Sequence, residues 1–393
     1  MKIETAWEVA PEESSGERAD RETRISDFAL FACLPLAGLA VPGLGLPVNE
    51  IAALAVVGLC AFRTPRAGPR PPWWFAGLLV AMLLFMAVSA QLNGIDASRR
   101  LVHLVGYVGI AVCLASGRVS MLSAARGLAI ALAGAVAYGA AVLPTSTYTG
   151  RLTGAFDDPN VGALLLTTLG AVSVPHVQKT WLRRLLLLAV AAGVLLTFSR
   201  TGLLALAFGL LWLLLGRRLR LAGGGLLVVA LVWVVDNIPQ DLRLLGPFSD
   251  RTGSDALRGR IIDQETSLLA SAPWYGNGPG TARVSVGNQQ FFFHNSYLAV
   301  RQEGGWVTLG IVVVLLGACF VYLSRADAGA GITERTWMQT GIIAVLAMGV
   351  SLGEVLLDLP TAVVLGFAMS SALSAARSAV IRPAALPAAA GVS

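Results

Sequence analysis

Long apolar runs separated by short polar segments dominate this sequence, and they restrict the possible folds more than any other feature. A helix needs about 20 mostly apolar residues to cross the hydrocarbon core of a membrane. By this criterion the chain contains about twelve spans, of which the second, eighth and ninth are short. The spans are expected near 28–46, 49–62, 73–91, 101–117, 121–143, 161–177, 182–198, 201–216, 221–235, 297–323, 337–356 and 360–381. The sequence therefore predicts an all-α polytopic membrane protein.

The composition agrees with this fold class. Of the 393 residues, 55% are hydrophobic and only 13% are charged, whereas soluble proteins carry about 25% charged residues. The net charge is +6, but the basic residues form short clusters between apolar runs, which argues against nucleic-acid binding. The four cysteines lie inside apolar runs without metal-ligand spacing, so they are interpreted as buried apolar side chains.

Three of the predicted spans have unusual features. The first contains Pro35 and Pro42, so it is expected to be kinked or broken. The spans at 182–198 and 201–216 are separated by only a few residues, which requires a sharp turn between them.

Lysine and arginine are concentrated in every second connection, which predicts that both termini are cytoplasmic. The chain is then divided into five parts along its length. These are a disordered cytoplasmic tail at 1–26, nine spans within 27–235, an extracytoplasmic loop at 236–295, three spans within 296–382 and a cytoplasmic tail at 383–393.

The outer loop between spans 9 and 10 is too long for a simple connector and is expected to be functional. It contains the amphipathic stretch SDALRGRIIDQETSLLAS, which predicts a helix on the outer membrane face. A glycine-rich turn, PWYGNGPGTA, follows and leads to the polar stretch HNSYLAVRQEGGWVT at 294–308.

Four charged or titratable residues on the predicted outer face suggest a chemistry. His294 suits proton transfer near neutral pH, and Arg301 follows it by seven residues, a spacing that places two residues on one face of a helix. Arg200 and Arg260 suit a diphosphate, since a guanidinium stays charged and binds such groups through two hydrogen bonds. The alternatives are a solvated histidine, an arginine that snorkels to the surface and an exposed helix face.

Other classes of chemistry find less support in the sequence. Asp157 and Asp158 could hold a metal or act as bases, but the following Pro159 and Asn160 favour a turn and helix cap. The sequence has neither a P-loop nor a dinucleotide fingerprint, and it has no metal triad. A nucleotide sugar or ATP is therefore not expected as donor, and neither a metal nor another cofactor is predicted.

Together these motifs resemble the O-antigen ligase and polymerase superfamily of bacterial envelope glycan assembly. The ligase pattern is matched by His294, Asn295, Gly305 and Thr308, with Glu303 where an acid is common. The segments GNGPGTA (276–282), GAFDDPN (154–160) and FSRTG (198–202) are similar to other family motifs, and Arg260 matches the arginine that opens the loop helix.

The resemblance implies a metal-independent, inverting glycosyltransferase of the bacterial inner membrane whose active site faces the periplasm or cell exterior. Its donor would be an undecaprenyl-diphosphate-linked glycan. Its acceptor would be lipid A-core for a ligase, which Thr308 favours, or another lipid-linked unit for an O-antigen or exopolysaccharide polymerase. His294 would be the base, and Arg200 and Arg260 would bind the diphosphate. Supporting roles are expected for Asn295, Tyr297, Arg301, Arg151 and Asn160.

A polytopic transporter is the alternative from another class. Transporters are commonly built from internal repeats, with polar sites near the bilayer midplane. This sequence has no evident repeat, and its polar motifs gather on the predicted outer face.

Overall fold

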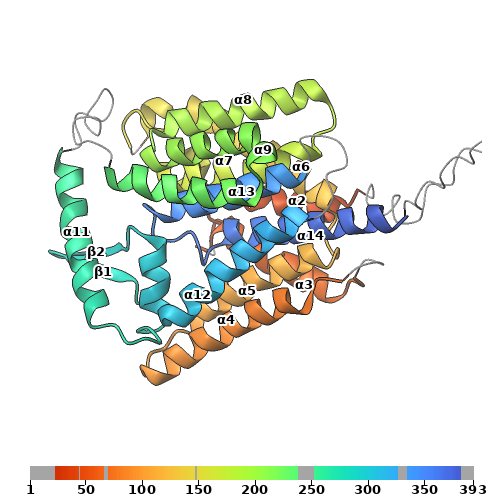
Figure 1. Ribbon diagram of the computed structural model, residues 1–393. Coiled ribbons are helices and arrows are strands. Elements are labelled where there is room, and N and C mark those ends of the chain that lie inside the picture. Colours follow the sequence, from red (N-terminus) through yellow and green to blue (C-terminus); the bar gives the residue numbers. More distant parts are fainter. Residues whose placement is uncertain are drawn as a thin grey trace, which may run out of the picture.

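The computed structural model describes residues 23–43, 45–65, 70–146, 148–237, 252–325 and 334–381. These ranges form a helical bundle with one small β-hairpin (Figure 1). Most of the predicted tail at 1–26, the predicted tail at 383–393 and segment 238–251 of the predicted outer loop lie outside the described residues.

The helices of the first part of the chain are α2 (Ile25–Cys33), α3 (Val48–Ala61), α4 (Trp73–Leu92), α5 (Ser98–Ala115), α6 (Met121–Ala141), α7 (Pro159–Ser173), α8 (Thr180–Thr197) and α9 (Arg200–Asn237). Short 3₁₀ turns lie at Leu143–Thr145, Gly154–Phe156 and Val174–His176. The second part contains α11 (Thr252–Ala270), β1 (Arg283–Val286), β2 (Gln289–Phe292), α12 (Ser296–Arg325), α13 (Glu334–Gly349) and α14 (Leu359–Ile381).

Among the described helices, α4, α5, α6, α8 and most of α12 are long and apolar enough to cross a membrane. Shorter apolar helices cover Val48–Ala61, Arg200–Gly216 and Leu359–Ser374. Helices suit this environment because hydrocarbon offers no hydrogen bonds to the backbone, and a helix satisfies its own N–H and C=O groups. The predicted helical membrane class is thus confirmed, while the count of twelve spans stays a prediction.

Helix α7 forms part of the centre of the bundle. Every residue from Gly162 to Ser173 is buried, so the helix is covered around its whole circumference. It packs against α6, α8, α9, α13 and α14. A helix that is apolar on all sides is expected in the interior of a large bundle.

The predicted span at 28–46 is not one helix. Helix α2 ends at Cys33, directly before Leu34 and Pro35, as expected because the residue before a proline disfavours helical backbone. The chain then forms turns with a single β-bridge between Ala40 and Pro47. The N–H group of Gly38 donates to the carbonyl oxygen of Ala155 at 2.9 Å. A β-carbon on Gly38 would lie 2.6 Å from the nitrogen of Asp157, so only glycine allows this close packing.

Helix α9 turns back on itself. Twelve residues of straight helix rise about 18 Å, yet a β-carbon on Gly224 would lie only 3.8 Å from the ring of Trp212. The two arms pack together, and the second arm, green in Figure 1, runs toward the end of the bundle that carries α11. These arms contain the segments predicted as the spans at 201–216 and 221–235.

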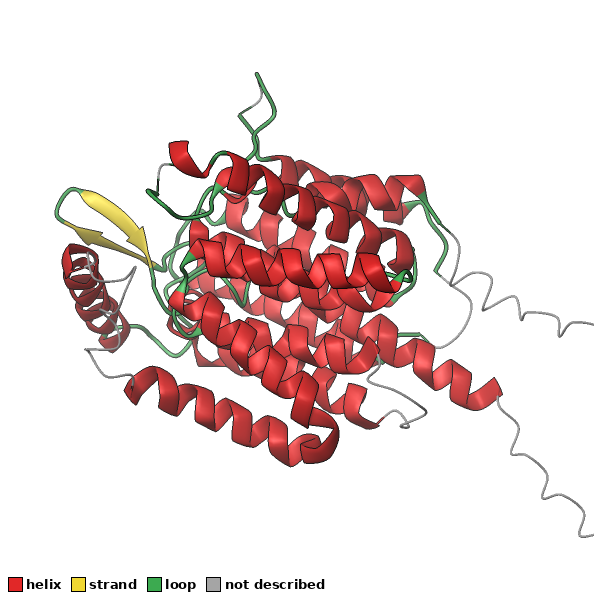
Figure 2. Ribbon diagram, turned by 90° about the horizontal axis from the view of Figure 1, so that it is seen from above, coloured by secondary structure: helices red, strands yellow, loops and turns green. Residues whose placement is uncertain are grey.

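A small unit stands at one end of the bundle and consists of α11 and the β-hairpin (Figures 1 and 2). Strands β1 and β2 pair antiparallel, and Gly287 makes the tight turn with a φ of 64°. The unit has its own apolar core, which reaches α12 through Leu298 and Ala299. This core contains Leu257, Ile261, Leu269, Ala282, Val284, Val286, Phe291 and Phe293.

The predicted amphipathic helix corresponds to α11. Ile261 and Leu269 are buried as its apolar pattern indicates, whereas Ile262 and Leu268 are exposed. The hairpin was not predicted from the sequence.

The start of α2 is held to the α5–α6 connection by a cluster of charged groups. The carboxylate of Asp27 accepts hydrogen bonds from the guanidinium of Arg63 and from the N–H group of Ser120. The guanidinium groups of Arg24 and Arg63 both donate to the carbonyl oxygen of Arg118. All of these residues except Asp27 belong to segments that are predicted from the sequence to be cytoplasmic.

The orientation can be tested with single cysteines at the two ends. Asn288 is exposed in the hairpin turn, and Thr64 is exposed beside the charged cluster. We expect Asn288→Cys to react with a membrane-impermeant thiol reagent in intact cells, and Thr64→Cys to react only after the membrane is opened. The native cysteines are buried or half-buried and supply a low background. The opposite labelling pattern would reverse the orientation.

Candidate active site

His294 lies in the turn that joins the hairpin to α12. The helix begins at Ser296, and Asn295 caps it, because its side-chain oxygen accepts from the N–H groups of Tyr297 at 2.9 Å and Leu298 at 3.2 Å. The prediction that His294 and Arg301 share a helical face is therefore wrong, since His294 precedes the helix.

Three other polar residues of this stretch make local contacts. The hydroxyl of Tyr297 donates to the carbonyl oxygen of Leu346 at 2.9 Å. The guanidinium of Arg301 lies 4.4 Å from the centre of the Trp306 ring, a cation–π contact. Ser296 anchors the segment before α14, because its hydroxyl accepts from two N–H groups there, those of Val355 and Leu356.

Glu265 of α11 contacts His294. Its Oε1 atom accepts a hydrogen bond of 2.6 Å from the N–H group of His294 and lies 3.8 Å from the imidazole Nδ1. The Glu265 side chain is only 1% exposed, and burial raises the pKa of its carboxyl group. Burial, followed by the positive charge of Arg258, lowers the pKa of His294 below its ordinary value.

The two arginines of α11 occupy different sides of the helix. Arg258 is half-buried and belongs to the side that carries Ile261 and Glu265, three and seven residues further on. Arg260, the residue predicted from the sequence, is exposed. The charge that acts on His294 is therefore that of Arg258.

Arg200, Arg151 and Asn160 belong to a second group, at the α8–α9 turn. Phe198 ends α8 with a φ of 44°, and Arg200 is half-buried at the first position of α9. The hydroxyl of Ser199 donates to the side-chain oxygen of Asn160 at 2.9 Å, and the guanidinium of Arg151 donates to the carbonyl oxygen of Thr197 at 2.8 Å. The motifs GAFDDPN and FSRTG thus pack against each other.

Asp158 caps α7, as the sequence suggested. Its carboxylate accepts from the N–H groups of Asn160 at 2.6 Å and Val161 at 3.2 Å, and Pro159 occupies the first helical turn. Within the described residues, no group of three histidine, cysteine, aspartate or glutamate side chains is arranged to hold a metal ion.

Helix α12 is broken at Gly305, where φ is 71° and ψ is −170°. This backbone conformation is almost restricted to glycine. A β-carbon on Gly305 would lie 1.9 Å from the carbonyl oxygen of Trp274, so the position also lacks room for a side chain.

The glycine-rich turn PWYGNGPGTA fills this break. Main-chain N–H groups of the turn donate hydrogen bonds to carbonyl groups of α12 that lack helical partners because of the break. One N–H group of α12 donates to a carbonyl group of the turn. The bonds are Asn277 N–H to Gln302 O at 2.7 Å, Gly278 N–H to Glu303 O at 3.0 Å and Trp306 N–H to Trp274 O at 2.9 Å. Helix α4 joins the assembly, because Ser89 donates to the carbonyl oxygen of Glu303 and Asn93 to that of Gly276.

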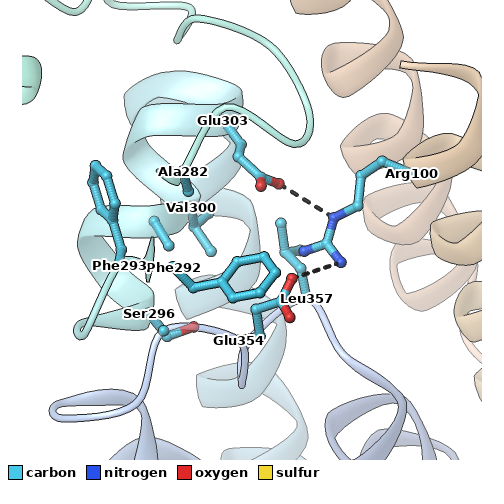
Figure 3. Close-up of a pocket in the computed structure, with 11 residues that line it drawn as sticks. Arg100, Ala282, Phe292, Phe293, Ser296, Val300, Glu303, Glu354 and Leu357 are labelled. Atoms are coloured by element: carbon cyan, nitrogen blue, oxygen red, sulfur yellow. Dashed lines mark hydrogen bonds and ion pairs between the residues drawn. The ribbon is translucent and has the colours of Figure 1, made fainter. Parts of the chain in front are cut away.

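A cleft lies beside the start of α12, on the side of Phe293 and Ser296 (Figure 3). Arg100 of α5 forms ion pairs of 3.4 Å there with Glu303 of α12 and Glu354 of the segment before α14. The ring of Phe292 points into the same space as the two carboxylates. Neither Arg100 nor Glu354 was predicted from the sequence as a site residue.

Comparison with known proteins supports the resemblance. Residues 185–313 match the family model described as O-antigen ligase. The matched range contains Arg200, Arg260 and His294, together with the break in α12. No curated protein shows significant similarity to this sequence.

The helical bundle with apolar spanning helices defines a polytopic membrane protein. The family match shows that residues 185–313 are similar to the O-antigen ligase superfamily. It thereby supports a glycosyltransferase-like function in the processing of membrane-linked glycans, of the ligase or polymerase type.

The importance of Gly305 can be tested with two matched substitutions. Gly305→Ala places a methyl group against Trp274 in an unfavourable backbone conformation, so we expect a loss of at least about 1–3 kcal/mol in the free energy of unfolding. Gly310→Ala is the control, because Gly310 lies in the same helix with no neighbour within 4 Å of its β-carbon position. Thermal unfolding in detergent measures both. Equal melting temperatures for the two variants would contradict a structural role for the break.

Proposed function

We propose that this protein transfers a glycan from an undecaprenyl-diphosphate carrier to an acceptor hydroxyl on the outer face of the bacterial inner membrane. The acceptor we favour is lipid A-core, as in an O-antigen ligase. The observation that carries the proposal is the position of His294, half-buried at the junction of α12 and the hairpin inside the family-matched range. A repeat-unit polymerase would use the same chemistry with a lipid-linked glycan as acceptor.

His294 acts as general base in this proposal. The acceptor oxygen forms a bond to the anomeric carbon while the bond from that carbon to the diphosphate oxygen breaks. The proton of the hydroxyl moves to the imidazole, and the diphosphate leaves with the electron pair. A single displacement of this kind inverts the anomeric configuration. No metal enters the proposed step, since the arginines supply the positive charge.

Arg200 and the arginines of α11 stabilise the leaving diphosphate. Guanidinium groups hold phosphate oxygens through paired hydrogen bonds and stay charged throughout the reaction. Arg200 starts α9, and the second arm of α9 runs toward the end of the bundle that carries α11. Arg260 matches the family position. Arg258 is the arginine whose charge, after burial, lowers the pKa of His294.

Removal of the base tests the assignment. We expect His294→Ala to lower the rate of glycan transfer by about 10²- to 10⁴-fold, which is the usual contribution of general base catalysis. The variant should accumulate normally in the membrane and still bind the lipid-linked donor, because the side chain is partly exposed. Purified protein, a synthetic lipid-diphosphate glycan and lipid A-core form the assay, with a second lipid-linked unit as the competing acceptor. Transfer at the wild-type rate would exclude His294 as base.

The pH dependence of the transfer rate is a second test of His294 as the base. A base must be neutral, so the rate falls as the pH drops through the pKa of His294. Because burial and Arg258 lower that pKa, we expect the acidic limb below the unperturbed value of about 6.5.

The arginines can be separated by a matched pair of variants. Arg258→Ala removes a positive charge that acts on His294, so we expect the acidic limb to move to higher pH. Arg260→Ala should leave this limb in place and raise the KM for the donor if Arg260 binds the diphosphate. Arg200→Lys keeps the charge without the two-pronged geometry and should still impair transfer. Unchanged donor kinetics in both Arg200→Ala and Arg260→Ala would locate the diphosphate site elsewhere.

A further inference from the structure

Glu265 occupies a position where an apolar residue is expected. Ile261, Glu265 and Leu269 follow one another at intervals of four along the buried side of α11, and their exposed fractions are 1%, 1% and 5%. A carboxylate is rarely buried in such a stripe without a partner, because removing its charge from water is costly. A polar group that breaks the local pattern is commonly found at functional sites.

The partner of this carboxylate is the turn that carries His294. Oε1 accepts from the main-chain N–H group of His294, and the imidazole Nδ1 lies 3.8 Å from the same oxygen. Both Nδ1 and the Oε2 atom of Glu265 are buried, and neither has a hydrogen-bond partner among the described residues. A small rotation of either side chain would bring Nδ1 and a carboxylate oxygen to the usual distance of about 2.8 Å.

The other side of the imidazole is open. The His294 side chain is 31% exposed although its Nδ1 atom is buried, so the exposed edge of the ring faces away from Glu265. A proton held on Nδ1 by the carboxylate would leave the lone pair of Nε2 on this open side.

We infer that Glu265 is a positioning residue for His294. Its carboxylate accepts a hydrogen bond from Nδ1–H, fixes the tautomer with a free Nε2 and stabilises the imidazolium that forms when Nε2 takes a proton. The catalytic meaning of this pair rests on the proposed function, whereas the pairing itself rests on the contacts of the two side chains.

The electrostatic surroundings make the pair sensitive to the protonation of His294. The groups that face the imidazole are Arg258 and Glu265 of α11 and the main-chain carbonyl of Phe292 in β2. Burial disfavours the charge on Glu265, and burial together with Arg258 disfavours the charge on His294. When both groups are charged they compensate each other, so the carboxylate stabilises the state after proton transfer more than the state before it.

The tautomer and the pKa of His294 can be measured without a glycan. The chain has only three histidines, so histidine labelled with ¹³C and ¹⁵N in nanodisc-embedded protein gives a simple spectrum, and His294→Gln assigns the resonance. We expect the neutral ring of the wild type to carry its proton on Nδ1. In Glu265→Gln the amide oxygen can still accept from the backbone, but the charge is lost, so the pKa of His294 should fall by about one unit.

The control is Asp263→Asn, which removes the same charge from the exposed side of the same helix. It should leave the tautomer and the pKa of His294 unchanged. In the transfer assay, Glu265→Gln should lower kcat by roughly tenfold or more without a matching change in the donor KM, and Asp263→Asn should not.

The inference is overturned if the neutral wild-type ring carries its proton on Nε2, or if Glu265→Gln leaves the pKa of His294 unchanged. The wild-type tautomer decides the matter alone if the variant does not fold. An Nδ1–H tautomer in a protein that transfers no glycan would refute the proposed function and leave the pairing intact.

Discussion

The main-chain hydrogen bonds that fill the break in α12 determine where the outer unit lies. A helix interrupted at Gly305 leaves carbonyl groups without partners, and an unsatisfied carbonyl is costly near a membrane, where water is scarce. The turn at 273–280 supplies the missing N–H groups and is thereby fixed against α12 and α4. The hairpin follows this turn directly and leads into His294, so the position of the imidazole depends on a bond network about ten residues away.

Ion pairs add a second connection at the same end of the bundle. Arg100 joins α5 to α12 through Glu303 and to the segment before α14 through Glu354. Burial also raises the pKa of Asp358, at the start of α14, to about 6. An arginine that pairs with two carboxylates from different elements holds these elements together, and loss of the pair with Glu303 would leave a buried carboxylate without its partner. The cleft between these elements is thus bounded on one side by paired charges and on the other by the apolar side chains of Phe292, Phe293 and Val300.

The sequence predicted the parts of the structure that depend on local pattern. The apolar runs, the break near Pro35, the amphipathic helix and the cap at Asp158 all follow from periodicity or from the chemistry of single residues. Arg283–Val286 alternates polar and apolar residues and Gly287–Asn288 is a two-residue turn, but the hairpin was missed because the strands are only four residues long and Gln289–Phe292 does not alternate. The shared face of His294 and Arg301 failed because the helix starts two residues after the histidine.

The candidate site could be predicted only in part. His294, Arg200 and Arg260 came from residue chemistry and family resemblance, and no structural observation assigns their roles. Glu265 was within reach, since it interrupts an apolar spacing of four residues, but its contact with His294 joins positions 29 residues apart. Arg100 and Glu354 carry no local signal, because their pairing arises only when distant helices meet.

The arrangement on α11 links donor binding to the basicity of His294 under the proposed function. Arg258 and Glu265 lie two helical turns apart on one side and act on the imidazole with opposite signs. Without substrate, burial and the charge of Arg258 lower the pKa of His294 and favour the neutral ring, which is the form a base requires. A diphosphate bound beside Arg258 would offset that positive charge, so the pKa of His294 would rise and Glu265 would dominate. The imidazole would then become a stronger base when the donor is bound. The acceptor hydroxyl would therefore lose its proton mainly in the complex that also contains the glycan donor.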